Sequence, residues 1–283
     1  MGRIDLHLHT NQSDGQYAPR ALVALAADCG ITLMSITDHD TIDGIAEGAE
    51  AAREAGMDFI PGIEISVKGD RELHILGYCI DCEDRELLRM NAEFVRLRGL
   101  REERIYAYLE EKGVSVSRAC VRAYAAGGMV GRPHFARALV EAGYAADLKD
   151  AFIKYLSTPD FYAIERPKPT PRVGIDVIRA AGGIAVLAHP VVLRLSAPAL
   201  DALLTDLVKE GLGGLECYYS SHNPNQTALY LSLARKHGLV VTGGSDFHGE
   251  LVKRDVKIGM GVNGPLEFDD FDIKRKLYAM RWK

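Results

Sequence analysis

Short apolar segments alternate with helical segments along most of this chain. The apolar segments lie at 3–6, 31–37, 57–67, 72–81, 184–190, 214–220 and 239–248. The helical segments lie at 19–30, 41–56, 170–183, 200–211, 225–238 and 269–282. Alternation of this kind is typical of α/β folds with a largely parallel sheet. About seven such units predict an irregular barrel, in which an active site lies at the C-terminal ends of the strands.

The alternation is interrupted once, between residues 86 and 168. Stretches such as RLRGLREERIYAYLEEKG are rich in Arg and Glu and have a helical pattern. We therefore expect an inserted small α-helical subdomain at 86–168. The barrel would then consist of residues 1–85 and 169–283, and the prolines of YAIERPKPTP predict a stiff return to it.

The composition argues against several classes of protein. The chain is 47% hydrophobic and 26% charged, which is typical of globular proteins. Its formal net charge of −5 argues against a general nucleic-acid or membrane-surface binder. It has no apolar run of about 18 residues, so we expect no membrane-spanning helix. The five cysteines are scattered and odd in number. We expect reduced thiols, a cytoplasmic protein and no stable protein partner.

Histidines and carboxylates gather next to the predicted strands. His7 and His9 are one residue apart at the end of the first strand, so both imidazoles project from one face. The others near strand ends are Asp38, His39, Asp40, Glu64, His74, His189, Glu216, Asp246 and His248. Each one alone is explained by a core histidine or a helix N-cap. Buried imidazoles and carboxylates are costly without partners, and metal ions offset that cost, so the set predicts a multinuclear metal site.

Five segments resemble the motif regions of the polymerase and histidinol phosphatase (PHP) family of metallophosphoesterases. They are HLHTNQSDG, SITDHDTIDG, PGIEIS, AHP and GGSDFHG, in the family's order. The resemblance implies the PHP fold, a distorted (β/α)7 barrel, with two to three divalent metal ions. The ligand groups that it implies are His7, His9, Glu64 and Asp246; Asp14, His39 and His248; and His74 and His189, with Glu64 bridging to the first group. Nitrogen and oxygen ligands without a thiolate suit manganese, zinc and iron alike. We expect Mn²⁺ first, with Zn²⁺ or Fe²⁺ as alternatives.

Three residues are candidates for catalysis. Asp246 counts as a catalytic residue as well as a ligand. Asp40 either orients the His39 imidazole or caps a helix. His222 either gives a proton to the leaving group, binds phosphate or caps a loop.

The predicted insert supplies candidate substrate contacts. GRPHFARALVEAGYAADLKDAFIKYL resembles the insert of PHP proteins that act on nucleotide or small sugar phosphates. Arg132 and His134 lead a helix there, and both a guanidinium fork and a helix N-terminus favour phosphate. A salt bridge at the helix N-terminus is the alternative for these two residues. Lys168 is a further candidate.

The resemblance implies a phosphoesterase that removes the 3′-phosphate from nucleoside 3′,5′-bisphosphates, with short oligonucleotides as possible further substrates. The alternatives are a phosphodiesterase and phosphatase acting on a cyclic ribose phosphate, and a histidinol-phosphate phosphatase. A non-catalytic metal-binding PHP domain belongs to a different class and would lack ligands. A metal-dependent amide hydrolase would carry a lysine at a strand end, and the sequence places none there. The expected partner is thus a small phosphorylated substrate.

Overall fold

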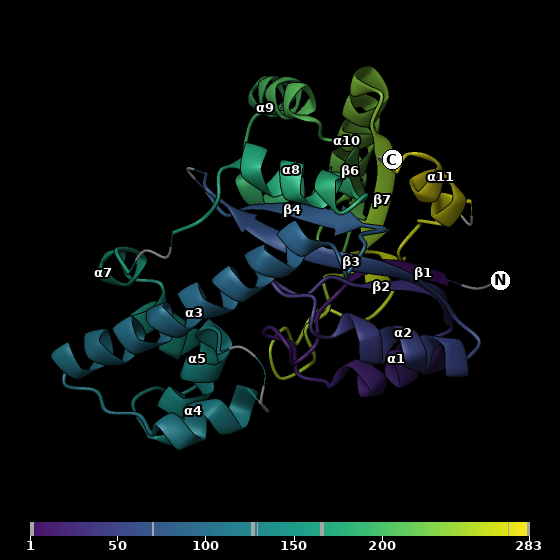
Figure 1. The fold of residues 1–283 in the computed structure, drawn as a ribbon. Coiled ribbons are helices and arrows are strands. Elements are labelled where there is room, and N and C mark those ends of the chain that lie inside the picture. The colour runs from purple at the N-terminus through teal and green to yellow at the C-terminus, as the bar shows by residue number, and fades with distance from the viewer. Residues whose placement is uncertain are drawn as a thin grey trace.

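The computed structural model describes residues 3–69, 71–125, 128, 130–164, 167–270 and 272–281. Seven strands form one sheet in chain order (Figure 1). They are β1 (Arg3–Leu8), β2 (Ile31–Ile36), β3 (Asp58–Val67), β4 (Leu73–Tyr78), β5 (Ile184–Leu187), β6 (Gly214–Tyr219) and β7 (Val240–Gly244). Leu8 forms a parallel bridge with Phe247, and the His9 amide donates to the Phe247 carbonyl at 3.0 Å. These contacts bring β1 beside the end of β7, so the sheet is a nearly closed, distorted barrel and the predicted fold class is confirmed.

One of these seven strands runs against its neighbours. Pairing is parallel from β1 to β3 and from β5 to β7, whereas β4 is antiparallel to both β3 and β5. The link between β3 and β4 is too short for a helical crossover, so the two strands form a hairpin. The start of β4, with His74, therefore lies at the same rim as the C-terminal ends of the parallel strands.

Strand alternation separates the residues that face the helices from those that face the barrel interior. On β4, Leu73 and Ile75 belong to the apolar cluster that joins the sheet to the outer helices. Leu76 and Tyr78, on the opposite face, pack with residues of the other strands. His74 shares the face of Leu76, and Glu64 on β3 shares the face of Ile60. Both side chains consequently project into the mouth of the barrel.

Helices cover the outside of the barrel. They are α1 (Pro19–Asp28), α2 (Ile45–Glu54), α8 (Pro171–Ala180), α9 (Ala197–Glu210) and α10 (Pro224–His237). The last helix, α11 (Ile273–Ala279), instead packs Ile273 and Leu277 into the cluster of Leu76 and Tyr78. The side chains of Thr170, Ser196 and Asn223 each accept a hydrogen bond from the amide three residues further on, which starts α8, α9 and α10. Gly211 and Gly238 end α9 and α10 in the left-handed conformation. Three short elements complete this part: a 3-10 helix (Pro190–Leu193) and two antiparallel strands, β8 (Met260–Gly261) and β9 (Gly264–Pro265).

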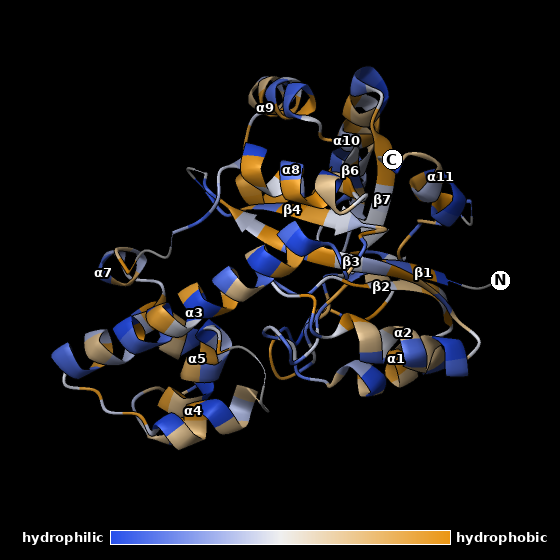
Figure 2. Ribbon diagram, viewed as in Figure 1, coloured by the Kyte–Doolittle hydropathy of each residue, from blue (hydrophilic) through white to orange (hydrophobic). Residues whose placement is uncertain are grey.

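The chain between β4 and α8 is largely helical where the structure describes it. It forms α3 (Arg85–Glu111), α4 (Arg118–Ala125), α5 (Arg132–Glu141), α6 (Leu148–Ala151), a π-helix (Phe152–Leu156) and α7 (Pro159–Tyr162). Figure 1 shows α3 leaving the barrel, with α4, α5 and α7 near its far half. These helices share a separate buried cluster that includes Phe135, Leu139 and Phe161. Hydrophilic and hydrophobic residues alternate along α3, as expected of an amphipathic helix (Figure 2). Among the described residues, no helix has the length and apolarity needed to cross a membrane.

Candidate metal centre

The buried Glu64 carboxylate lies at the centre of a group of imidazoles. The imidazoles are those of His7, His9, His39, His74 and His189. Glu64 Oε1 lies 2.9 Å from both His74 Nδ1 and His189 Nε2. Glu64 Oε2 lies 2.9 Å from His39 Nδ1 and 3.4 Å from the Nε2 atoms of His7 and His9. The two oxygens thus face different imidazoles, which is the arrangement expected of a carboxylate that bridges two cations.

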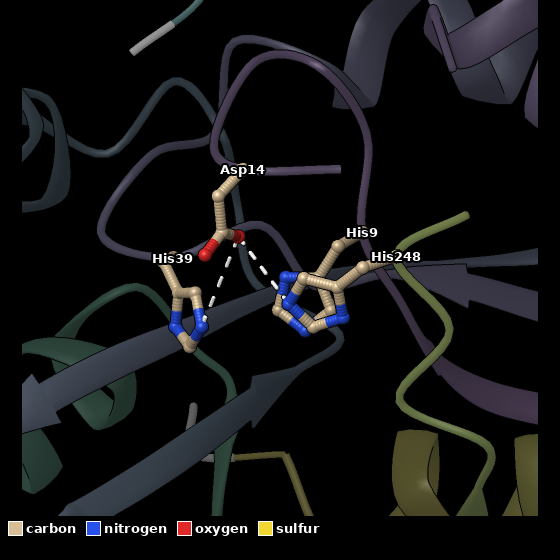
Figure 3. Close-up of side chains that lie close together, drawn as sticks. All are labelled: His9, Asp14, His39 and His248. Atoms are coloured by element: carbon tan, nitrogen blue, oxygen red, sulfur yellow. Dashed lines mark ion pairs between the residues drawn. The ribbon is translucent and has the colours of Figure 1, made fainter. Parts of the chain in front are cut away.

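A second group lies beside it (Figure 3). Asp14 Oδ1 is 3.3 Å from His248 Nε2 and 4.0 Å from His39 Nε2. The rings of His9 and His248 stack, with centroids 3.9 Å apart and planes at 21°. These four residues come from three distant parts of the sequence, and barrel closure brings them together.

Asp246 directs its two oxygens to different partners. Oδ1 lies 3.2 Å from His9 Nε2 and 3.3 Å from His248 Nδ1. Oδ2 accepts hydrogen bonds from the Tyr219 hydroxyl at 2.8 Å and from the Lys253 ammonium at 2.6 Å. Oδ1 is therefore the oxygen that Asp246 can offer to a cation among the histidines.

The surroundings of three carboxylates of the centre, those of Glu64, Asp14 and Asp246, favour the ionised form. Burial alone would raise the pKa values of Glu64, Asp14 and Asp246. The neighbouring imidazoles, and for Asp246 the Lys253 ammonium first, hold all three pKa values well below their ordinary range. The barrel mouth thus carries concentrated negative charge, and these carboxylates in turn raise the pKa of His7 well above its ordinary value and that of His39 to about 9.

The residues present fit divalent metal ions. Several buried atoms of the centre make no hydrogen bond of good geometry to any described residue, although some have ion-pair neighbours: His7 Nε2, His9 Nδ1 and Nε2, Asp14 Oδ1, His39 Nδ1, Glu64 Oε2 and His189 Nδ1. Three groups have ligand atoms within 4.8 Å of one another: His9, Asp14, His39 and His248; His7, His9 and Asp246; and His39, Glu64 and His74. Buried polar atoms without partners are rare in proteins, and a bound cation would satisfy these. The structure therefore brings all nine predicted ligands together in one cluster, whose donors fit divalent metal ions.

The grouping differs in detail from the one that the family resemblance implies. His39 accompanies Glu64 and His74 in the third group. His189 approaches the same Glu64 oxygen as His74, and its Nε2 lies 3.3 Å from His74 Nδ1. His189 also has φ of 23°, a strained value for a residue with a side chain.

Glu216 orients two of these histidines. Its Oε1 lies 2.9 Å from His7 Nδ1, and its Oε2 accepts a hydrogen bond from the His189 amide at 2.6 Å. A carboxylate on Nδ1 fixes the ring tautomer so that Nε2 presents its lone pair to a metal. The position of Glu216 near a strand end was a signal for this role. Tyr219 and Lys253 carried no comparable signal, because only the fold brings them to Asp246.

Asp40 fixes the loop that carries His39. Its Oδ1 accepts from the Ser66 amide at 2.8 Å, and its Oδ2 accepts from Arg98 Nη2 at 2.6 Å. Its own amide donates to the Glu64 carbonyl at 2.9 Å. Gly44, and not Asp40, is the N-cap residue of α2. Asp40 thus joins the His39 loop to β3 and to α3 of the insert.

His222 lies beyond the Tyr219 ring, as seen from the metal ligands. The Tyr219 ring contacts His189 and His222, with centroids 5.6 and 5.1 Å away. His222 Nδ1 donates to the Cys217 carbonyl at 2.9 Å, and its buried Nε2 finds no hydrogen-bond partner in the described part of the chain. Burial lowers the pKa of His222. In the neutral ring, Nε2 therefore accepts a hydrogen bond, and it donates only after taking up a second proton.

The predicted substrate contacts lie on the insert side of the same mouth. Arg132 Nη2 is 3.2 Å from Glu72 Oε1, and that oxygen is 4.0 Å from His74 Nε2. Lys168 lies close enough to lower the pKa of Glu72, together with His74 and Arg132. His134 is buried and accepts a hydrogen bond from the Gly131 amide at 2.9 Å, so its Nδ1 caps the start of α5.

The barrel and its donors define a protein with a divalent-metal centre, and comparison with known proteins agrees. The PHP domain matches residues 5–165. The 5′-3′ exoribonuclease Rnm of Escherichia coli is 37% identical over 247 residues, which cover 86% of this chain and 84% of that protein. A 3′,5′-nucleoside bisphosphate phosphatase of Chromobacterium violaceum is 32% identical over 257 residues, 88% of each chain. The solved structure of a candidate metal-dependent phosphoesterase from Bifidobacterium adolescentis superposes with a TM-score of 0.83 at 33% identity, covering 98% of this chain and 96% of that one.

The chain belongs to the PHP-domain family. Each of these relatives is named for the hydrolysis of phosphate esters. The class expected from the sequence, a hydrolase acting on phosphoester bonds, is confirmed.

We predict that His134 makes folding sensitive to mild acid. Burial lowers its pKa in the folded chain to about 4, from an ordinary value of 6.5. Between these values the unfolded chain binds the extra proton, so stability falls as the pH falls. His134→Asn keeps an acceptor for the Gly131 amide and removes the titration. Urea unfolding should show the wild type losing about 2 kcal/mol more than the variant between pH 7 and pH 5. Parallel pH profiles would contradict this prediction.

We predict that Asp246→Asn and His9→Ala each lower phosphatase activity by more than about a hundredfold, because the first removes the negative charge of a predicted metal ligand and the second removes a ligating imidazole. Circular dichroism should show the fold retained, and metal analysis should show less bound metal. His237→Ala is the matched control, since this imidazole pairs with Asp201 at the surface. Undiminished turnover with unchanged metal content would refute the ligand assignment.

Proposed function

We propose that this protein is a metal-dependent phosphatase that removes the 3′-phosphate from nucleoside 3′,5′-bisphosphates, with short oligonucleotides as further substrates. The observation that carries the proposal is the joint placement of a histidine–carboxylate metal centre and two basic side chains at one barrel mouth. Arg132 and Lys168 both approach Glu72, whose Oε1 lies 4.0 Å from the ligand His74. The bisphosphate phosphatase of Chromobacterium violaceum and the Escherichia coli exoribonuclease support the two substrate types.

We propose two to three divalent ions, Mn²⁺ first. The first would be held by His7, His9, Glu64 and Asp246, the second by Asp14, His39 and His248, and the third by His74 and His189 with Glu64. Such ions make a hydroxide nucleophile available at neutral pH and neutralise charge on the phosphate oxygens. Glu216 keeps His7 and His189 in the orientation that this requires. With five free cysteines, the chain suits the reducing cytoplasm, where we place it.

The other residues would bind and orient the substrate. The Arg132 guanidinium exchanges its exposed Glu72 partner for a phosphate, to which it can bind through two parallel hydrogen bonds. Lys168 adds positive charge on the same side. His222 Nε2 is buried and has no hydrogen-bond partner among the described residues. It can take up a proton next to a phosphate dianion and then donate it toward the leaving oxygen. Asp40 holds the His39 loop in place while the substrate binds.

The experiment that tests the function is phosphate release with Mn²⁺ from a small panel. The panel contains adenosine 3′,5′-bisphosphate, a cyclic ribose phosphate, a short oligonucleotide and histidinol phosphate. We expect selective release from the bisphosphate, with 5′-AMP as the product. Turnover of only the cyclic ester, or only of histidinol phosphate, would replace the proposed substrate. No release from a metal-loaded chain would refute the function.

Arg132→Ala should raise KM for the bisphosphate about tenfold or more and change kcat less, because the side chain contributes binding. Lys149→Ala is the matched control. It removes a positive charge from an exposed position of the insert on α6. Kinetic constants of Arg132→Ala equal to those of the control would remove Arg132 from the substrate site.

A further inference from the structure

Lys253 places a fixed positive charge at the metal centre. It lies in the irregular segment after β7, and its Nζ donates to Asp246 Oδ2 at 2.6 Å. Asp14 and Glu64 are close enough to act on it electrostatically. Its side chain is 36% exposed, whereas that of Asp246 is 6% exposed, so the ammonium reaches a buried carboxylate from the open side. None of the ligand groups or substrate contacts described above includes this lysine.

The second partner of the same oxygen is neutral. The Tyr219 hydroxyl donates to Asp246 Oδ2 at 2.8 Å. Oδ2 is therefore occupied twice, and Oδ1 alone faces His9 and His248. If Lys253 lost its charge, Tyr219 would still hold the carboxylate in this orientation. Tyr219 can replace the hydrogen bond that Lys253 donates, but it cannot replace the positive charge of Lys253.

We propose that Lys253 is a resident cation that competes with the divalent metal for the charge of Asp246. It stabilises the buried carboxylate before metal binds, and it lowers the affinity of the centre for metal. The physical reason is that an ammonium at Oδ2 repels a divalent ion at Oδ1 of the same carboxylate, in surroundings of low dielectric constant. The proposal rests on the metal centre of the proposed function and is independent of the substrate.

The test is calorimetric titration of the metal-free full chain with Mn²⁺. Lys253→Met removes the charge and keeps the aliphatic stem, and Lys253→Gln removes the charge and keeps a donor. Both should bind Mn²⁺ about tenfold more tightly than the wild type. Lys253→Arg restores the charge and should bind like the wild type. Lys257→Met, an equal charge change at an exposed position of the same segment, is the control and should also bind like the wild type.

A second measurement is the melting temperature with and without Mn²⁺. Lys253→Met and Lys253→Gln should melt lower than the wild type without metal, because a buried carboxylate has lost its counter-charge. Added Mn²⁺ should raise their melting temperatures by more than it raises that of the wild type.

The outcomes separate this proposal from the proposed function. Unchanged or weaker Mn²⁺ binding in folded Lys253→Gln would overturn the competition by Lys253 and leave the function standing. If Lys253→Met folds only with metal, the Mn²⁺ affinity of the Lys253→Gln variant decides whether Lys253 competes with the metal. A wild-type chain that binds no Mn²⁺ would overturn the metal centre and, with it, both proposals.

Discussion

The mouth of this barrel depends on one interaction. Imidazoles from several strand ends share a single buried carboxylate, that of Glu64. An isolated ionised carboxylate in such a place would be very costly. Here the imidazoles surround both oxygens, and bound cations would complete the compensation. The barrel supplies the geometry, because its strand ends converge on one rim regardless of their distance in the sequence. The closure of the barrel is therefore what brings the residues of the metal centre together.

Backbone strain accompanies this convergence. Asp40, His189 and Asp246 all have positive φ, at 57°, 23° and 57°. Strain of this kind costs about 1–3 kcal/mol per residue and persists only where the surroundings enforce it. Each of the three is held by specific bonds: Asp40 by Ser66 and Arg98, the His189 amide by Glu216, and Asp246 by Tyr219 and Lys253. The ligands are therefore directed by a backbone that the polar network keeps in place.

Much of the fold could be predicted from the sequence, because the periodicity of strands and helices is a local property. The gathering of these histidines and carboxylates at one rim could be predicted because the strand ends of a barrel converge there. The direction of β4 could not be read from its own residues, since it depends on the length of the preceding link. Lys253 and Tyr219 escaped prediction for a different reason. Their contact with Asp246 depends on the conformation of the loop after β7, and neither a lysine nor a tyrosine by itself indicates a metal centre. Arg98 likewise resembles any arginine of an amphipathic helix until the fold brings Asp40 to it.

The antiparallel direction of β4 also governs the shape of the insert. Tyr78, at the end of β4, pairs with Ile184 at the start of β5, so the chain leaves the barrel at the end opposite the metal centre. Strand β4 runs about 20 Å away from the metal centre. The stretch of α3 from Arg85 to Arg98 runs about 20 Å back toward the level of that centre. Only after that stretch does the 27-residue helix reach the insert's own core. The length of α3 therefore sets the distance of the insert from the barrel, and side chains keep their direction only when that length changes by whole helical turns. One added residue would rotate everything beyond it by about 100° and carry Arg98 away from Asp40. Relatives of this chain can therefore be expected to vary the height of the insert in steps of three or four residues.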